Sequence, residues 1–140
     1  MSAQTDLQAD ARPSAIDHVQ LAAPPGCEQL ARDFYGGLLG LREIEKPVPL
    51  RARGGAWFGL GTGQLHIGVE TEFAPARKAH PALSVPAAGL DALAERLEAA
   101  GAPVRWDHAL AGVRRFFTED PWGNRLELLA SVESTGADST

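Results

Sequence analysis

The chain has 140 residues, a hydrophobic fraction of 44% and a formal net charge of −5. This size and apolar content suit one domain with a hydrophobic core, and the negative charge argues against a nucleic-acid partner. The sequence holds no apolar run long enough to cross a membrane and no signal-peptide pattern, and its single cysteine, Cys27, excludes an internal disulfide. We therefore predict a cytoplasmic protein that binds neither membranes nor nucleic acids.

The first half of the chain predicts a strand, a helix and three further strands. Residues 16–23 alternate in the manner of a strand. A helical apolar stripe occupies residues 27–40, where Gly40 is a typical C-terminal stop. Three strand-like runs separated by glycine and proline follow, at residues 42–48, 55–60 and 64–70.

The second half repeats this order after a proline-containing basic loop. Residues 80–85 read as a strand, and residues 89–101 carry the clearest helical stripe of the chain. Three more strand-like runs close the sequence, at residues 102–107, 113–119 and 125–130.

Two pairs of residues give the repeat its register. His18 and His80 each begin the phrase His-x-x-Leu-x-x-Pro, 62 positions apart, and His66 and Glu127 are 61 positions apart near the end of each half. An internal repeat of this kind indicates two similar structural units.

We expect one domain over residues 15–131, made of βαβββ modules at roughly 15–72 and 79–131. Residues 1–14 and 132–140 are expected to be flexible tails. The predicted fold class is α+β, in which the two modules form a cupped eight-stranded mixed sheet with the helices on its outer face.

The four repeat-related residues form a candidate metal site. His66 and Glu127 are each flanked by two apolar residues, and side chains alternate across a strand, so both should point away from the core. A single strand histidine is usually a surface or core residue, but His18, His66 and His80 share equivalent positions with Glu127. We predict that these four bind one divalent ion, with Zn, Ni, Fe(II), Co and Mn all compatible. Glu127, the acid among them, is the candidate catalytic residue.

Further residues are candidates for contact with a substrate. Trp57 and Phe58 are neighbours on one strand, so one should face the cup and the other the core. Arg115 and Phe117 lie on the strand before the final turn, where an arginine suits a carboxylate or phosphate, although a solvated edge arginine is equally compatible. His108 lies outside the repeat and is expected at the surface.

The chain resembles the vicinal oxygen chelate superfamily, which includes glyoxalases, bleomycin-resistance proteins and extradiol dioxygenases. The resemblance covers roughly residues 16–130 and rests on "IDHVQLA", "ARDFYGGLLGL", "AHPALSV" and "FFTEDPWGNRLELL". By this resemblance, His18, His80 and Glu127 match the three usual metal ligands, and His66 matches a fourth position used in the glyoxalase branch. In glyoxalase I, the position of His66 usually carries a carboxylate.

The resemblance implies a metal-dependent enzyme whose small substrate chelates the ion through vicinal oxygens. An isomerase, a lyase and a dioxygenase all remain open, and the alternative is a resistance protein that sequesters an antibiotic or toxin without turnover. Related proteins are commonly homodimers, so we predict a homodimer with His18 and His66 from one chain and His80 and Glu127 from the other.

Overall fold

The computed structural model describes residues 10–131, so the predicted tails at 1–9 and 132–140 lie outside it, while residues 10–14 are exposed. The strands of the first half are β1 His18–Ala23, β2 Glu43–Ile44, β3 Ala56–Leu60 and β4 Gly63–Val69. Those of the second half are β5 Ala82–Ser84, β6 Arg105–Asp107, β7 Val113–Glu119 and β8 Arg125–Ser131. The helical elements are α2 Glu28–Ala31, η1 Arg32–Leu38, η2 Val48–Arg53, η3 Ala87–Gly89 and α3 Leu90–Ala99.

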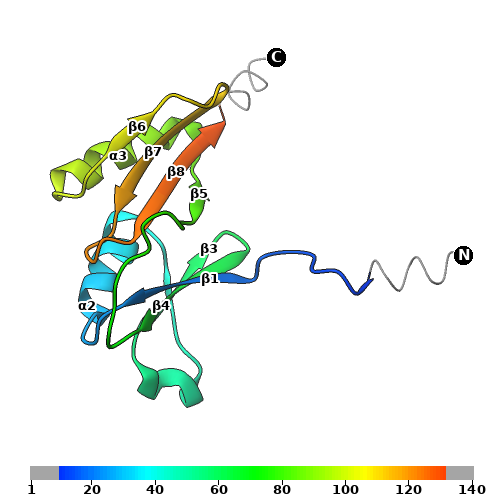
Figure 1. Ribbon diagram of the computed structural model, residues 1–140, viewed down its shortest axis with the longest axis vertical. Coiled ribbons are helices and arrows are strands. Elements are labelled where there is room, and N and C mark those ends of the chain that lie inside the picture. The colour runs from blue at the N-terminus through cyan, green and yellow to red at the C-terminus, as the bar shows by residue number, and fades with distance from the viewer. Residues whose placement is uncertain (1–9, 132–140) are drawn as a thin grey trace, which may run out of the picture.

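Both halves have the same topology, which confirms the α+β class and the two βαβββ modules. The strand orders are β1-β4-β3-β2 and β5-β8-β7-β6. In each sheet the first and last strands of the module pair in parallel, and the remaining pairs are antiparallel. The modules follow one another in Figure 1, the second above the first.

The eight strands form two sheets of four rather than the single eight-stranded sheet that we predicted. β1 and β5 are edge strands of their own sheets, and an open groove of about 810 Å³ lies between them, lined by both strands. The two modules contact each other through side chains on the helix-covered faces of their sheets, not through hydrogen bonds between β1 and β5. The two sheets therefore stay separate.

The predicted helices are present, with one change in type. In α3, the predicted stripe is buried: Leu90, Leu93, Ala94 and Leu97. The first helix begins as the α-helix α2 but continues as the π-helix η1, which is wider than an α-helix. None of the helices within residues 10–131 has the length and apolar character needed to cross a membrane.

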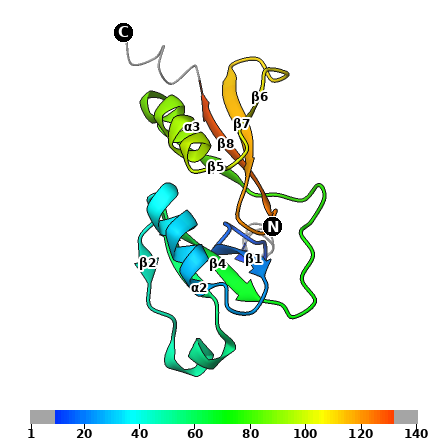
Figure 2. The same ribbon diagram turned by 90° about the vertical axis from the view of Figure 1, so that its left-hand side faces the viewer.

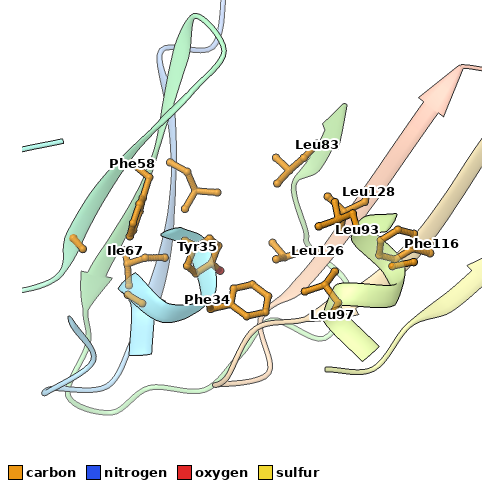
Figure 3. Close-up of a cluster of buried hydrophobic side chains, with 14 of the residues drawn as sticks. Phe34, Tyr35, Phe58, Ile67, Leu83, Leu93, Leu97, Phe116, Leu126 and Leu128 are labelled. Atoms are coloured by element: carbon orange, nitrogen blue, oxygen red, sulfur yellow. The ribbon is translucent and has the colours of Figure 1, made fainter. Parts of the chain in front are cut away.

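One hydrophobic core joins the two modules. In Figure 2, α2 and α3 lie in front of their sheets, on the same side of the molecule. Figure 3 shows Phe58 and Ile67 of the first sheet and Leu83 and Leu128 of the second pointing into a common cluster, with Tyr35 between them. Both sheets therefore turn their helix-covered faces toward the same core, and their other faces are left open.

Buried polar contacts also connect the modules. Tyr35 Oη donates a 2.7 Å hydrogen bond to Asp120 Oδ2 in the turn before β8, and Asn124 Nδ2 donates at 2.8 Å to the carbonyl of Ala22. Asp120 Oδ1 accepts from the backbone N–H of Trp122 and of Asn124, which closes the turn. Gly123 has a φ of 90° there, in the left-handed region that favours glycine. The turn thus fixes one module against the other.

We expect Tyr35 to make stability fall at alkaline pH. Burial, with a smaller contribution from the charge of Asp120, raises the pKa of Tyr35 well above the usual 10.0. Below pH 10 the phenol is neutral in both the folded and the unfolded chain. Above that pH only the unfolded chain ionises, so the free energy of unfolding should fall by up to about 1.4 kcal/mol per pH unit until the folded pKa is reached.

Urea unfolding at a series of pH values measures this effect, and Tyr35→Phe should remove it while lowering stability at neutral pH by about 1.5–3 kcal/mol. Tyr35 is the only tyrosine, so tyrosinate absorbance follows its ionisation directly. Cys27→Ser is the control, because burial also raises the pKa of Cys27 from its usual 9.0. Ionisation of Tyr35 in the folded protein near pH 10 would contradict the prediction.

Candidate metal-binding site

Strand alternation places His18, His66 and Glu127 on the open faces of the two sheets, whereas His80 lies two residues before the start of β5. Leu65 and Ile67 are 0% and 1% exposed in the core, so His66 between them points to the other face of β4. Glu127 stands in the same relation to its two leucine neighbours on β8, which are also in the core. In the pairing of β1 with β4, Gln20 lies opposite His66. His18 is two residues before Gln20, so its side chain lies on the same face of the sheet as His66.

Three aromatic rings stack on the open face of the first sheet. The indole of Trp57 lies 3.8 Å from the imidazole of His66 at an interplanar angle of 2°, and His66 lies 4.3 Å from the imidazole of His18 at 17°. The stack leaves His66 only 3% exposed. Burial, followed by the charge of His18, lowers the pKa of His66, which favours the neutral imidazole that can bind a metal. We call His18, His66 and Trp57 the first half-site.

Hydrogen bonds orient the two imidazoles of the first half-site differently. His18 Nδ1 lies 2.8 Å from Asp17 Oδ1, which leaves Nε2 available as a ligand. His66 Nε2 lies 2.7 Å from Gln64 Oε1, so this nitrogen already has a partner. His18 is therefore the better prepared ligand of the pair.

His80 and Glu127 form a close pair on the second sheet. His80 Nε2 is 3.0 Å from Glu127 Oε1, and its Nδ1 is 2.7 Å from the carbonyl of Lys78. Arg115 donates to Glu127 Oε2 at 3.2 Å and approaches Asp107 Oδ1 at 3.5 Å. One carboxylate oxygen thus faces the histidine while an arginine holds the other, an arrangement that orients metal ligands.

An aromatic ring completes this second group. Phe117 is 8% exposed and lies edge-on to His80, with ring centroids 5.4 Å apart. The guanidinium of Arg115 lies 5.4 Å from the same ring centroid, and that of Arg125 only 4.3 Å from it. We call His80, Glu127, Arg115 and Phe117 the second half-site.

The two half-sites do not meet within one chain. In the described range of residues 10–131, no three His, Cys, Asp or Glu side chains are grouped so that they could hold an ion. His18 and His80 both line the groove between β1 and β5, but His66 and Glu127 do not. Each half-site offers two donors, and their chemistry, imidazole nitrogen with one carboxylate oxygen, suits a divalent transition metal.

The structure distinguishes the two aromatic neighbours that the sequence could not. Phe58 is 0% exposed and packs against Tyr35 in the core, so the prediction that it contacts a substrate is wrong. The reason is alternation, since Trp57 occupies the open face beside His66. On β7, Arg114 faces the helix side and pairs with Asp91 of α3 at 2.9 Å, which leaves Arg115 on the open face.

Sequence reasoning missed several polar residues around the ligands: Asp17, Gln64, Asp107 and Arg125. A signal for Gln64 and Arg125 was present, because each lies two positions from a predicted ligand on the same strand and must share its face. His108 is exposed, as predicted, and is the chain neighbour of Asp107, the acid that approaches Arg115.

A comparison of the sequence with protein families identifies a superfamily for the chain. The profile of the Glyoxalase/Bleomycin resistance protein/Dioxygenase superfamily matches residues 15–128. The chain belongs to this superfamily. No protein of curated function matches the sequence.

Solved structures of this superfamily share the fold. A protein from Bacillus anthracis assigned to the glyoxalase family is 48% identical, with a TM-score of 0.81 over 86% of this chain and 97% of that one. A lactoylglutathione lyase from Agrobacterium tumefaciens is 24% identical, with a TM-score of 0.63 over 84% and 94%. The fosfomycin resistance protein FosX from Listeria monocytogenes is 18% identical, with a TM-score of 0.69 over 86% and 95%. At these last two identities the likeness concerns the fold alone.

Proposed function

We propose that this glyoxalase-superfamily protein is a divalent-metal-dependent enzyme acting on a small substrate that chelates the ion through vicinal oxygens. The site is shared by two chains, with His18 and His66 from one and His80 and Glu127 from the other. Isomerase, lyase and dioxygenase reactions all fit this ligand set, as do Zn, Ni, Fe(II), Co and Mn.

The observation that carries this proposal is the placement of two ligand pairs on the faces turned away from a common core. Ile67, the neighbour of His66, and Leu128, the neighbour of Glu127, both point into this core. His66 and Glu127 point the other way, so the two ligand pairs cannot meet in the core. Among the strands that the structure describes, β1 and β5 each pair on one side only, and an unpaired strand edge favours pairing with another chain. A second copy that sets its β5 beside β1 would complete the ligand set twice in a symmetric dimer.

The residues of each half-site then have separate tasks. When bound, a divalent ion supplies Lewis-acid polarisation to two adjacent substrate oxygens. Glu127 moves a proton between substrate carbon and its carboxylate, while Arg115 keeps one carboxylate oxygen fixed at 3.2 Å. The flat ring of Trp57 and the edge of Phe117 provide apolar walls that exclude water from the substrate.

Complementation between two inactive variants tests the shared site. The first variant is His18→Ala with His66→Ala, and the second is His80→Ala with Glu127→Ala. Each homodimer should bind no metal with high affinity. After co-expression or joint refolding, a heterodimer joins the intact first half-site of one chain to the intact second half-site of the other, so about one ion per heterodimer should return.

Metal content and light scattering together read out this experiment. A mixture of wild type with either variant provides the control for subunit exchange. Failure of the mixed variants to recover metal, while the wild-type protein binds it as a monomer, would contradict a site shared by two chains.

A sequestering protein without turnover is the second candidate function. The open groove of about 810 Å³ between β1 and β5 favours it, since a groove of this size can accommodate a small molecule. Binding of a ligand that is never converted, with or without metal, would support this candidate over the enzyme.

A further inference from the structure

Arg125 lies beside the second half-site and forms no ion pair within residues 10–131. It is two positions before Glu127 on β8 and therefore shares its open face. Its guanidinium lies 4.3 Å from the ring centroid of Phe117, which supports it as a flat platform. The Cα atoms of residues two apart along a strand are separated by about 7 Å, so Arg125 is a near neighbour of the proposed metal ligand Glu127 on this face.

The other arginines on this sheet face are already paired. They form the contacts Arg105 with Glu119 at 3.7 Å, Arg115 with Asp107 at 3.5 Å, and Arg115 with Glu127 at 3.2 Å. Among the described residues, Arg125 forms no ion pair, and its Nε is buried without a hydrogen-bond partner. A guanidinium that lacks a partner and rests on an aromatic ring is arranged to receive an anion from outside the chain.

We propose that Arg125 binds an anionic arm of the substrate, a carboxylate or a phosphate, while the vicinal oxygens of the same molecule bind the metal. The proposal rests on the proposed function and adds the substrate class: small acids whose charged group lies a few bonds from the chelating oxygens. Phe117 orients the guanidinium, and Arg115 stays with Glu127 as a positioning residue. Arg125 therefore determines specificity.

Three hydroxamates of equal chain length separate the metal contact from the anion contact. The hydroxamate group supplies two vicinal oxygens to the metal in each. The other end carries a carboxylate in succinic monohydroxamate, a phosphonate in 3-phosphonopropionohydroxamate, and a neutral amide in the amide of succinic monohydroxamate. Calorimetry on the full-length, zinc-reconstituted protein should show that one of the two anionic probes binds at least about tenfold more tightly than the amide.

Variants assign this preference to a side chain. Arg125→Gln should bind the charged and neutral probes equally, with zinc affinity unchanged. Arg114→Gln is the matched control, because this arginine on β7 faces α3 and should leave the preference intact. Arg115→Gln should weaken all three probes together, since its effect passes through Glu127.

The outcomes distinguish the two proposals. Equal binding of all three probes by the wild-type protein would overturn the proposed anionic subsite but would not contradict the proposed metal site. A preference that survives in Arg125→Gln would overturn the assignment to Arg125. Absence of binding by every hydroxamate would overturn the metal site itself, and the subsite with it. The stronger anionic probe identifies the arm as a carboxylate or a phosphate.

Discussion

Replacing His80 or Glu127 by alanine is expected to weaken divalent-metal binding by at least about a hundredfold. Removing an outer-shell partner already costs about ten- to a hundredfold in affinity, and these two residues are proposed as direct ligands. Their atoms His80 Nε2 and Glu127 Oε1 are 3.0 Å apart, so both can reach one ion. In Glu127→Ala the guanidinium of Arg115 would also lose its closest acceptor, so its positive charge would no longer be compensated by Glu127.

Titration with cobalt, followed by its visible absorbance, measures this loss. His108→Ala is the control, because His108 is exposed and lies outside the repeat that relates the four predicted ligands. His66→Ala should have a smaller effect than His80→Ala, since His66 Nε2 is held by Gln64 at 2.7 Å. Equal losses in His80→Ala and His108→Ala would mean that the ligand assignment is wrong.

Glu127→Gln is expected to keep part of the metal affinity but lose turnover by about a hundredfold or more. The amide oxygen can still approach the ion, whereas the amide cannot accept a proton at neutral pH. Removing a positioned proton-transfer group typically costs about 10²- to 10⁴-fold in rate. Steady-state kinetics on a substrate found by screening acids with vicinal oxygens for metal-dependent thermal stabilisation measures the effect.

Glu98→Gln provides the control for this variant. Glu98 is exposed on α3, the helix that covers the other face of the second sheet. It should keep the parent rate. If Glu127→Gln also keeps the parent rate, Glu127 is a ligand only, and oxygen activation at the metal becomes the better explanation of the chemistry.

The sequence by itself determined the two modules and the sheet faces on which His18, His66 and Glu127 lie. Residues such as Leu65, His66 and Ile67 alternate with the fixed period of a strand, so the face of His66 follows once its neighbours are buried. The same reasoning holds for Glu127 on β8. The internal repeat further indicated that each module has one predicted metal ligand near its beginning and one near its end.

The sequence could not choose between the neighbours Trp57 and Phe58, because alternation says only that they face opposite ways. The structure places Phe58 in the core and Trp57 on His66. Arg125 likewise had a predictable face, but only the structure shows that it rests on Phe117 and that the acids nearby are paired with other arginines.

Only the tertiary structure decided how the modules sit against each other. Tyr35 and Asp120 are 85 positions apart and meet in a buried hydrogen bond, and one core draws on side chains from both sheets. Strand periodicity is set by the local backbone, whereas the packing of one module on another depends on the summed burial of many distant side chains. That packing turns each ligand pair to the face of its sheet that lies away from the common core. The sequence could not show this placement, which supports the proposal that a second chain completes the site.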